Sequence, residues 1–268
     1  MPETSAFLEA IYARYGYDLR EYALPSMSRR LQVALAKTGV ADLDALQDRV
    51  LADPLAFAAI LDDLTVRVSE LFRDPEVFRV VRERVAPVLR TYPLLNVWHA
   101  GCATGEEAYS MAMLLDEEGL LDRTQLYATD LIVPAIERAK EGVFSAEDLA
   151  GILERHTRTG AVTPFAGHAT IAYDRLAVAA KLRRRILFFQ HDLVSDYAFG
   201  TMQIVFCRNV LIYFGRELRL RVLRMFAKSV CVGGFLCLGT SERLPPELAG
   251  SFVEFAPEAH LYRRREAP

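Results

Sequence analysis

Apolar residues in the first third of the chain recur at helical spacing. One apolar stripe consists of Phe7, Leu8, Ile11, Tyr12 and Tyr15, and a second of Leu31, Val33, Leu35 and Ala36. Helix starts are indicated at Asp42, at Asp53 with Pro54, and at Asp74 with Pro75, because aspartate caps free backbone N–H groups and proline suits the first helical position. The pattern predicts a small all-helical N-terminal domain over residues 1–90.

From residue 91 onward, short apolar runs alternate with amphipathic helical stretches. Strands are predicted within QLYAT (125–129), ILFFQHDL (186–193), QIVFCRNVLIYF (203–214) and GGFLCLGTSE (233–242). This alternation is typical of an α/β fold with a doubly wound sheet, and the tail FVEFAPEAHLYRR can close it as a hairpin. Residues 143–185 break the rhythm and are expected to form an insertion with a short helix and a small antiparallel β-subdomain.

The stretch NVWHAGCATGEEAYSMAMLL (96–115) reads as a buried strand, a glycine turn and a helix. Gly101 and Gly105 lack the Cβ that would hold a ligand away from the backbone. Their G-x-x-x-G spacing differs from the G-x-G-x-x-G of dinucleotide binders, and Glu106 and Glu107 would repel a pyrophosphate. Carboxylates there attract a cation or sugar hydroxyls, which favours S-adenosylmethionine over NAD.

Polar residues follow two of the other predicted strands. Asp130 lies just over twenty residues past the glycine turn, where an acid can accept hydrogen bonds from ribose hydroxyls. Capping of the next helix is the alternative role for Asp130, and we favour ligand binding. Asn209, Val210 and Tyr213 end a later strand, at the carboxyl edge where open α/β sheets bind ligands.

Composition narrows the remaining choices. The 268 residues carry a net charge of −3, which gives no support to nucleic-acid binding. The four cysteines form no C-x-x-C pair, so we expect no metal. The chain shows neither an apolar run near 18 residues nor a signal peptide, so we expect a cytoplasmic protein without membrane insertion. We also expect a monomer. Arg29 and Arg30 could contact an acidic partner or form a solvated face.

The strings GCATGEEAYSMAM, ATD, FCRNVLIYF, LGTSE and SELFRDPEVF together closely resemble the chemotaxis receptor methyltransferases, the CheR family. The resemblance covers essentially the whole chain. It implies a helical N-terminal domain followed over residues 91–268 by a Rossmann-like methyltransferase domain with a mostly parallel seven-stranded sheet. It also implies transfer of a methyl group from S-adenosylmethionine to glutamates in the cytoplasmic signalling domains of chemoreceptors, giving methyl esters and S-adenosylhomocysteine.

The resemblance also assigns the site. Its cofactor contacts fall on Ser69, Arg73, Gly101, Glu107, Asp130, Asp192, Leu193, Asn209 and Val210. Arg73 and Tyr213 match the positions beside the transferring methyl group. On the residues alone, the loop at 69–73 reads as a helix connection anchored by Leu71 and Phe72, and the resemblance replaces that interpretation.

Two departures from the family pattern bear on the cofactor. The family loop usually reads N-x-T-x-F-F-R, whereas Arg67, Ser69 and Leu71 stand here at the first Asn, the Thr and the first Phe. Asp192 replaces the more usual Asn and keeps an acceptor for an adenine amino group while losing a donor.

The chemistry fits the implied residues. A glutamate carboxylate, with a pKa of about 4.3, is ionised at neutral pH and needs no general base. Arg73 is suited to placing it, Tyr213 to lining the path of the methyl group, and Arg29 and Arg30 to attracting an acidic receptor. Three alternatives are a small-molecule methyltransferase, a non-catalytic S-adenosylmethionine sensor or scaffold, and an NAD-dependent oxidoreductase, which the turn spacing disfavours.

Overall fold

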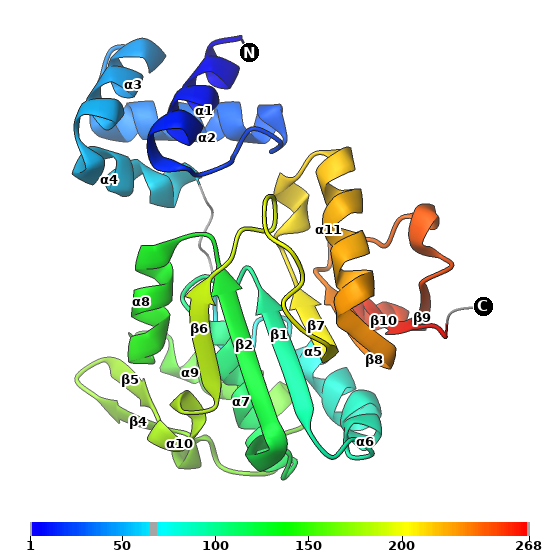
Figure 1. The fold of residues 1–268 in the computed structure, drawn as a ribbon. Coiled ribbons are helices and arrows are strands. Elements are labelled where there is room, and N and C mark those ends of the chain that lie inside the picture. Colours follow the sequence, from blue (N-terminus) through cyan, green and yellow to red (C-terminus); the bar gives the residue numbers. More distant parts are fainter. Residues whose placement is uncertain (1, 65–68, 267–268) are drawn as a thin grey trace. The chain divides into compact units, whose positions relative to one another are not determined.

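The computed structural model describes residues 2–64 and 69–266. Contacts divide the chain into two compact units (Figure 1). The helical unit comprises residues 1–68 with 211–222, and the sheet unit comprises residues 69–210 with 223–268.

The helical unit contains four helices, α1 (Pro2–Tyr15), α2 (Leu24–Thr38), α3 (Leu43–Ala52) and α4 (Pro54–Leu64), and the short turn η4 (Leu211–Tyr213). Asp42 caps α3 as expected, since its side chain accepts a hydrogen bond from the backbone N–H of Ala45 at 2.9 Å. The core includes Phe7, Ile11, Leu31 and Leu46. Val33 was expected in the apolar stripe of α2 but is 45% exposed.

The sheet unit begins with α5 (Pro75–Val80), the π-helical turn η1 (Val81–Val85) and α6 (Ala86–Leu89). These helices were expected to belong with the N-terminal domain. Instead Phe78, Val81 and Val85 are fully buried in the same core as the strands, which assigns the segment to the sheet unit. Among the helices of the described residues, none is both long and apolar enough to cross a membrane.

The main sheet has the seven strands implied by the resemblance, in the order β6-β2-β1-β7-β8-β10-β9. Their bounds are β1 (Leu95–Ala100), β2 (Thr124–Asp130), β6 (Ile186–Gln190), β7 (Met202–Cys207), β8 (Val230–Leu238), β9 (Phe252–Ala256) and β10 (Leu261–Arg264). The first five strands named in this order, β6 to β8, pair in parallel, and β10 is antiparallel to both β8 and β9, which confirms the closing hairpin.

Strand β1 lies between β2 and β7, with Val97 opposite Leu126 on one side and Ile204 on the other. The chain order reverses at this point, where open α/β sheets bind ligands beyond the carboxyl ends of their strands. Further helices of the sheet unit are α7 (Glu106–Glu117), η2 (Leu121–Arg123), α8 (Val133–Glu141) and α11 (Arg216–Ser229), which starts in the helical unit. Short helical turns η5 (Pro246–Leu248) and η6 (Pro257–Ala259) flank β9.

The insertion forms the expected small antiparallel sheet, in the order β3-β5-β4. It contains β3 (Val143–Ser145), α9 (Leu149–Arg158), η3 (Phe165–Gly167), β4 (Ala169–Ala172) and β5 (Arg175–Val178), followed by α10 (Ala180–Arg183). Buried Ile152, Phe165, Leu176 and Leu182 join the core of the sheet unit, so this β-subdomain packs on the unit that carries it.

The tryptophan in β1 anchors an aromatic cluster in the sheet unit. Trp98 is fully buried, and its indole N–H donates to the hydroxyl of Thr129 at 2.9 Å. The rings of His191, Phe199 and Phe226 meet it edge-on at centroid distances of 5.3, 4.7 and 5.3 Å. This packing fixes the end of β1 immediately before the glycine turn.

Candidate functional site

The glycine turn after β1 requires glycine for steric reasons. Gly101 and Gly105 have φ angles of +79° and +94°, in the left-handed region that glycine adopts without penalty. A Cβ on Gly101 would lie 2.4 Å from Cγ2 of Val210, so no side chain fits there unless Val210 moves. The turn therefore presents bare backbone beside the residues that follow β7.

Asp130, at the end of β2, holds this turn. One carboxylate oxygen accepts the backbone N–H of Ala103 at 2.8 Å, and the other accepts the N–H of Ile132, the residue before α8, at 3.0 Å. Asp130 therefore holds the residue before α8 but does not cap the helix, which has no side-chain cap. Ribose binding by Asp130 stays a prediction.

The two consecutive glutamates that begin α7 lie in opposite environments. The hydroxyl of Thr104 donates to the carboxylate of Glu106 at 2.8 Å, and burial raises the pKa of Glu106 above its usual value. Burial would also raise the pKa of Glu107, but hydrogen bonds from His99 and Arg208, each 2.9 Å long, outweigh it and lower that pKa. Glu107 is therefore held as a carboxylate.

Arg208 follows β7 and was not among the expected site residues. Its guanidinium pairs with the carboxylates of Glu107 and Asp74, and both of its terminal nitrogens lie 3.4 Å from the carbonyl oxygen of Arg73. Burial alone would lower its pKa, but the neighbouring carboxylates raise it. The sequence signal was a charged residue directly after the apolar run QIVFC, since a buried arginine needs partners.

The loop over residues 69–74 is strained and docked on α7. Phe72 and Asp74 have φ angles of +58° and +53°, an uncommon conformation for residues other than glycine. The N–H of Phe72 donates to the hydroxyl of Ser110 at 2.8 Å. The side chain of Ser69 hydrogen-bonds to Glu106, so the loop contacts the first two turns of α7 at two points.

Within this loop, Arg73 is partly exposed between the two left-handed residues. The expected capping of α5 by Asp74 is wrong, because the left-handed backbone turns the Asp74 carboxylate to Arg208 and no side-chain cap forms. Arg67 lies outside the described residues.

Asn209 is also in the left-handed region, with φ +61°. Its backbone N–H and that of Gly239 both donate to Glu242, at 3.1 and 2.6 Å, and a Cβ on Gly239 would lie 2.7 Å from the Asn209 nitrogen. Strand β7 consequently ends at Cys207, earlier than the expected run to residue 214. Glu242 is a further residue that the sequence analysis missed.

Asp192 and Leu193 follow β6. The Asp192 carboxylate organises its own turn, accepting the N–H of Val194 at 2.8 Å and the hydroxyl of Ser195 at 3.0 Å. Leu193 is largely buried. The turn is tied to β2 because the N–H of His191 donates to the carbonyl of Asp130 at 3.0 Å.

The expected arginine pair on α2 separates into one exposed and one buried side chain. Arg29 is exposed, whereas Arg30 is buried because it shares the inner face of α2 with Met27, Leu31 and Ala34. The Arg30 guanidinium lies 4.1 Å from the ring centroid of Tyr213 and donates to the carbonyl of Leu64, and burial lowers its pKa. An exposed pair is therefore wrong for Arg30. Tyr213 belongs to the helical unit, and its methyl-transfer role stays a prediction.

Within the sheet unit, most of the predicted cofactor residues gather at the carboxyl edge of β1, β2 and β7. Val210 contacts Gly101, Asp130 holds Ala103, and Glu107 reaches the 69–74 loop through Arg208. This edge offers bare backbone, carboxylate acceptors and one partly exposed guanidinium. Such donors and acceptors suit a ligand that carries an ammonium, a sulfonium and ribose hydroxyls. The fold and this edge define an S-adenosylmethionine-dependent methyltransferase.

Comparison with known families identifies the chain more closely. Residues 67–257 match the CheR methyltransferase, SAM binding domain, and residues 2–65 match the CheR methyltransferase, all-alpha domain. The protein belongs to the CheR methyltransferase family.

Several known proteins are similar in sequence to nearly the whole chain. A putative methyltransferase, Cher3, of Pseudomonas putida is 46% identical over 240 residues, which cover 90% of this chain and 88% of that protein. A chemotaxis protein methyltransferase of Vibrio parahaemolyticus is 33% identical, covering 90% of this chain and 87% of the relative. One of Listeria monocytogenes is 28% identical, covering 89% and 88%.

Proposed function

We propose that this protein transfers a methyl group from S-adenosylmethionine to glutamate side chains in the cytoplasmic signalling domains of chemoreceptors. The products are glutamate methyl esters and S-adenosylhomocysteine, which makes the protein a protein-glutamate O-methyltransferase. The observation that carries the proposal is the 69–74 loop, where Arg73 stands between two strained residues and its carbonyl is held by Arg208. Strain of this kind clusters at functional sites, where it fixes a side chain in advance.

The residues at the edge fit the cofactor. Gly101 lets Val210 lie against the turn, which brings two of the predicted cofactor residues together, and Glu107 is held ionised, as a partner for a cationic ligand requires. When bound, S-adenosylmethionine supplies an electrophilic methyl group. The glutamate carboxylate of the substrate forms the new C–O bond as the C–S bond breaks, and the electron pair of that bond stays on sulfur.

The protein's own part in this reaction is placement. The substrate carboxylate is already ionised, so a general base has no proton to remove. Arg73 can hold that carboxylate through two parallel N–H donors while it approaches in line with the methyl group. Binding that is too tight would reduce the nucleophilicity of the carboxylate, so we assign Arg73 to orientation.

The test is transfer of radiolabelled methyl groups to receptor signalling domains. Base should then hydrolyse the methyl esters and release labelled methanol. Arg73→Ala should abolish transfer with the fold intact by circular dichroism, and Arg73→Lys should restore little, because an ammonium lacks the planar fork. Arg79→Ala is the matched control, since Arg79 is a half-exposed arginine of α5 that pairs with Glu76, and it should keep wild-type turnover.

Three outcomes would overturn the proposal. Label transferred only to a small molecule would indicate a small-molecule methyltransferase. Tight binding of S-adenosylhomocysteine with no transfer to any acceptor would indicate a sensor or scaffold. Wild-type turnover in Arg73→Ala would return the 69–74 loop to a purely structural role.

We also propose that Arg29 attracts the receptor, whose methylated surface carries glutamates. Because Arg30 is buried, only Arg29 of the original pair is suited to this role. Arg29→Glu should raise the KM for receptor, with a smaller effect at high salt, where the Debye length falls to about 3 Å at 1 M. Lys37→Glu, an exposed charge reversal on the same helix, is the control. Coincident salt curves for wild type and Arg29→Glu would reject the role.

A further inference from the structure

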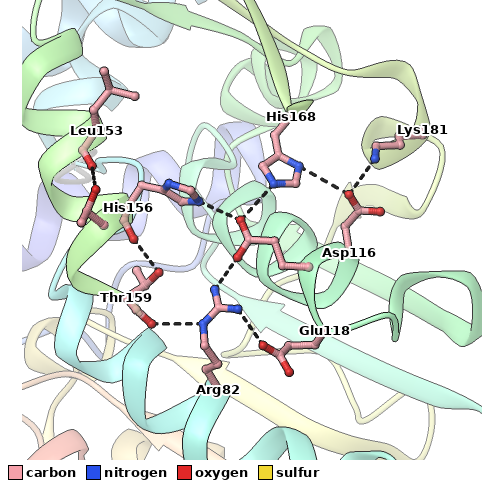
Figure 2. A network of polar contacts seen from close by, with 10 residues as sticks. Arg82, Asp116, Glu118, Leu153, His156, Thr159, His168 and Lys181 are labelled. Carbon is pink, nitrogen blue, oxygen red and sulfur yellow. Dashed lines mark hydrogen bonds and ion pairs between the residues drawn. The ribbon is translucent and has the colours of Figure 1, made fainter. Parts of the chain in front are cut away.

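A second polar cluster lies at the far end of α7 from the glycine turn. Its members are Glu117, the last residue of α7, His156 of α9 and His168, which precedes β4. Figure 2 labels the two histidines and their neighbours Arg82 and Asp116. The side chains of these residues are 1%, 5% and 2% exposed. Helix α7 rises about 1.5 Å per residue, so Glu117 lies about 15 Å, or nearly three turns, along the helix from Glu107. The proposed reaction does not use Glu117.

Both imidazoles point the same ring atom at one carboxylate oxygen. Nε2 of His156 and Nε2 of His168 lie 2.8 and 2.9 Å from Oε1 of Glu117, and the three atoms lie within 4.8 Å of one another. Bonds of about 2.0–2.1 Å to a tetrahedral zinc ion would separate its ligands by about 3.3 Å. A three-ligand site would therefore need the two Nε2–Oε1 distances to lengthen by about half an ångström and the two Nε2 atoms, which lie within 4.8 Å of each other, to stand about 3.3 Å apart.

The other nitrogen of His168 supports a ligand at this position. With Nε2 donating to Glu117, Nδ1 carries a lone pair, and this buried atom has no hydrogen-bond partner among the described residues. It lies 3.4 Å from the Asp116 carboxylate. The opposite tautomer would place a proton on Nδ1, directed at Asp116, and leave the Nε2 lone pair free. That is how metal-bound histidines are oriented by a carboxylate behind them.

The arginine beside Glu117 binds the carboxylate oxygen that the two histidines do not. Arg82 binds the other oxygen, Oε2, and also contacts Glu118 at 2.7 Å and the carbonyl of Thr159 at 3.1 Å. Lys181 pairs with Asp116 at 2.7 Å. Because Arg82 already shares the Glu117 carboxylate, a cation here should bind more weakly than at a four-cysteine site.

We propose that Glu117, His156 and His168 bind a divalent transition-metal ion, for which Zn²⁺ is the best match. Two imidazoles and one carboxylate are ligands that zinc accepts, and zinc imposes no geometry of its own. The fourth position is left for water. The sequence analysis looked for closely spaced cysteines and so did not find this site. Its two histidines lie 39 and 51 residues from Glu117 in the sequence. A bound ion would fasten α9 and the β-subdomain to α7.

The test uses the full chain, stripped with a chelator and dialysed against Zn²⁺. We expect one equivalent to bind and the melting temperature to rise. His156→Gln and His168→Gln should each weaken binding at least tenfold, and Asp116→Asn about tenfold through the orientation of His168. His260→Asn is the matched control, because His260 is largely buried, has a left-handed backbone that asparagine tolerates, and contacts Arg243 instead.

A measurement on the wild type covers the case in which a variant fails to fold. Zinc-edge X-ray absorption of the loaded protein should show two imidazoles and no sulfur. Failure of the wild type to bind zinc, a sulfur ligand in that spectrum, or unchanged affinity in well-folded His156→Gln and His168→Gln would each overturn the proposal. The cluster would then be a hydrogen-bonded junction only.

Discussion

Two turns flank the start of α7, and they reach unusual backbone angles by different means. The turn at 101–105 places two of its three left-handed φ angles, +79° and +94°, on glycines and the third, +48°, on Ala103, whereas the loop at 69–74 places +58° and +53° on Phe72 and Asp74. Non-glycine residues in this region cost about 1–3 kcal/mol each. The glycine turn is held chiefly by backbone groups of Thr129 and the carboxylate of Asp130, and the loop by side chains of Ser110 and Arg208.

The difference separates local from tertiary control of a site. The glycine turn needs less tertiary support, because glycine adopts two of its three left-handed angles without penalty and Asp130 holds the N–H of the third residue, Ala103. The 69–74 loop is stable only when β7 and α7 are assembled around it, since Arg208 and Ser110 belong to distant parts of the chain. Arg73 is therefore positioned by the folded sheet unit, and variants of the two turns should fail differently.

The largest effect is expected from removing the tertiary support. Arg208→Ala leaves Glu107 and Asp74 without their buried counter-ion, which should reduce the free energy of unfolding by about 3–5 kcal/mol and suppress methyl transfer. Urea denaturation measures the first and label transfer the second. Arg221→Ala is the control, because Arg221 makes a similar two-pronged contact with Glu21 at the surface and should cost at most about 1 kcal/mol. Equal losses in both variants would remove Arg208 from this role.

Next in size is the steric test of the glycine turn. Gly101→Ala introduces a left-handed alanine and a clash with Val210, with an expected loss of about 2–4 kcal/mol. Gly119→Ala, at φ +66° with nothing within 4 Å of the new Cβ, should cost only about 1 kcal/mol.

The clash itself is isolated by a double-mutant cycle. Adding Gly101→Ala in a Val210→Ala background should cost no more than Gly119→Ala, because the contacting methyl group is gone. A full loss in that background would assign the effect to the backbone alone.

A smaller effect is expected on cofactor affinity. If Asp130 accepts ribose hydroxyls, Asp130→Ala should weaken S-adenosylhomocysteine binding by about 1.5–3 kcal/mol in calorimetry. Asp122→Ala, which removes a fully exposed carboxylate, should leave affinity unchanged. Unaltered affinity in Asp130→Ala would limit Asp130 to holding Ala103 and Ile132.

The features that could be predicted from the sequence are the ones under local control, and those that could not depend on tertiary contacts. The strand, glycine turn and helix around Gly101, the place of Asp130 at the end of the next strand and the antiparallel insertion could all be predicted, because periodicity and turn residues encode them locally. The burial of Arg30, the pairing of Asp74 and the role of Arg208 could not, because each depends on a partner distant in sequence. The cluster of Glu117, His156 and His168 was missed for the same reason.

The smallest effect concerns the two adjacent glutamates of α7. Glu107 has a lowered pKa, so its contribution to the stability of the fold is present above pH 4.5, the ordinary pKa of glutamate, and is lost as the pH falls below that value. Glu106 has a raised pKa, so the fold loses stability as the pH rises above 4.5 and Glu106 ionises.

Urea unfolding of Glu106→Gln and Glu107→Gln between about pH 3 and pH 7 measures how the free energy of unfolding of each variant depends on pH. Relative to wild type, Glu107→Gln should flatten the loss of stability on the acid side, and Glu106→Gln should gain stability toward neutral pH. Slopes that change in the same direction would contradict the opposite environments of the two side chains.

The placement of Trp98 gives this protein a built-in optical reporter. It is the only tryptophan of the chain, so all indole emission comes from the strand that leads into the glycine turn. Its ring is shielded from water and meets the edge of His191, the neighbour of Asp192. Imidazoles quench excited indoles on contact, so a ligand that shifts either turn should change the fluorescence intensity or lifetime, and unlabelled cofactor analogues can be ranked by direct titration.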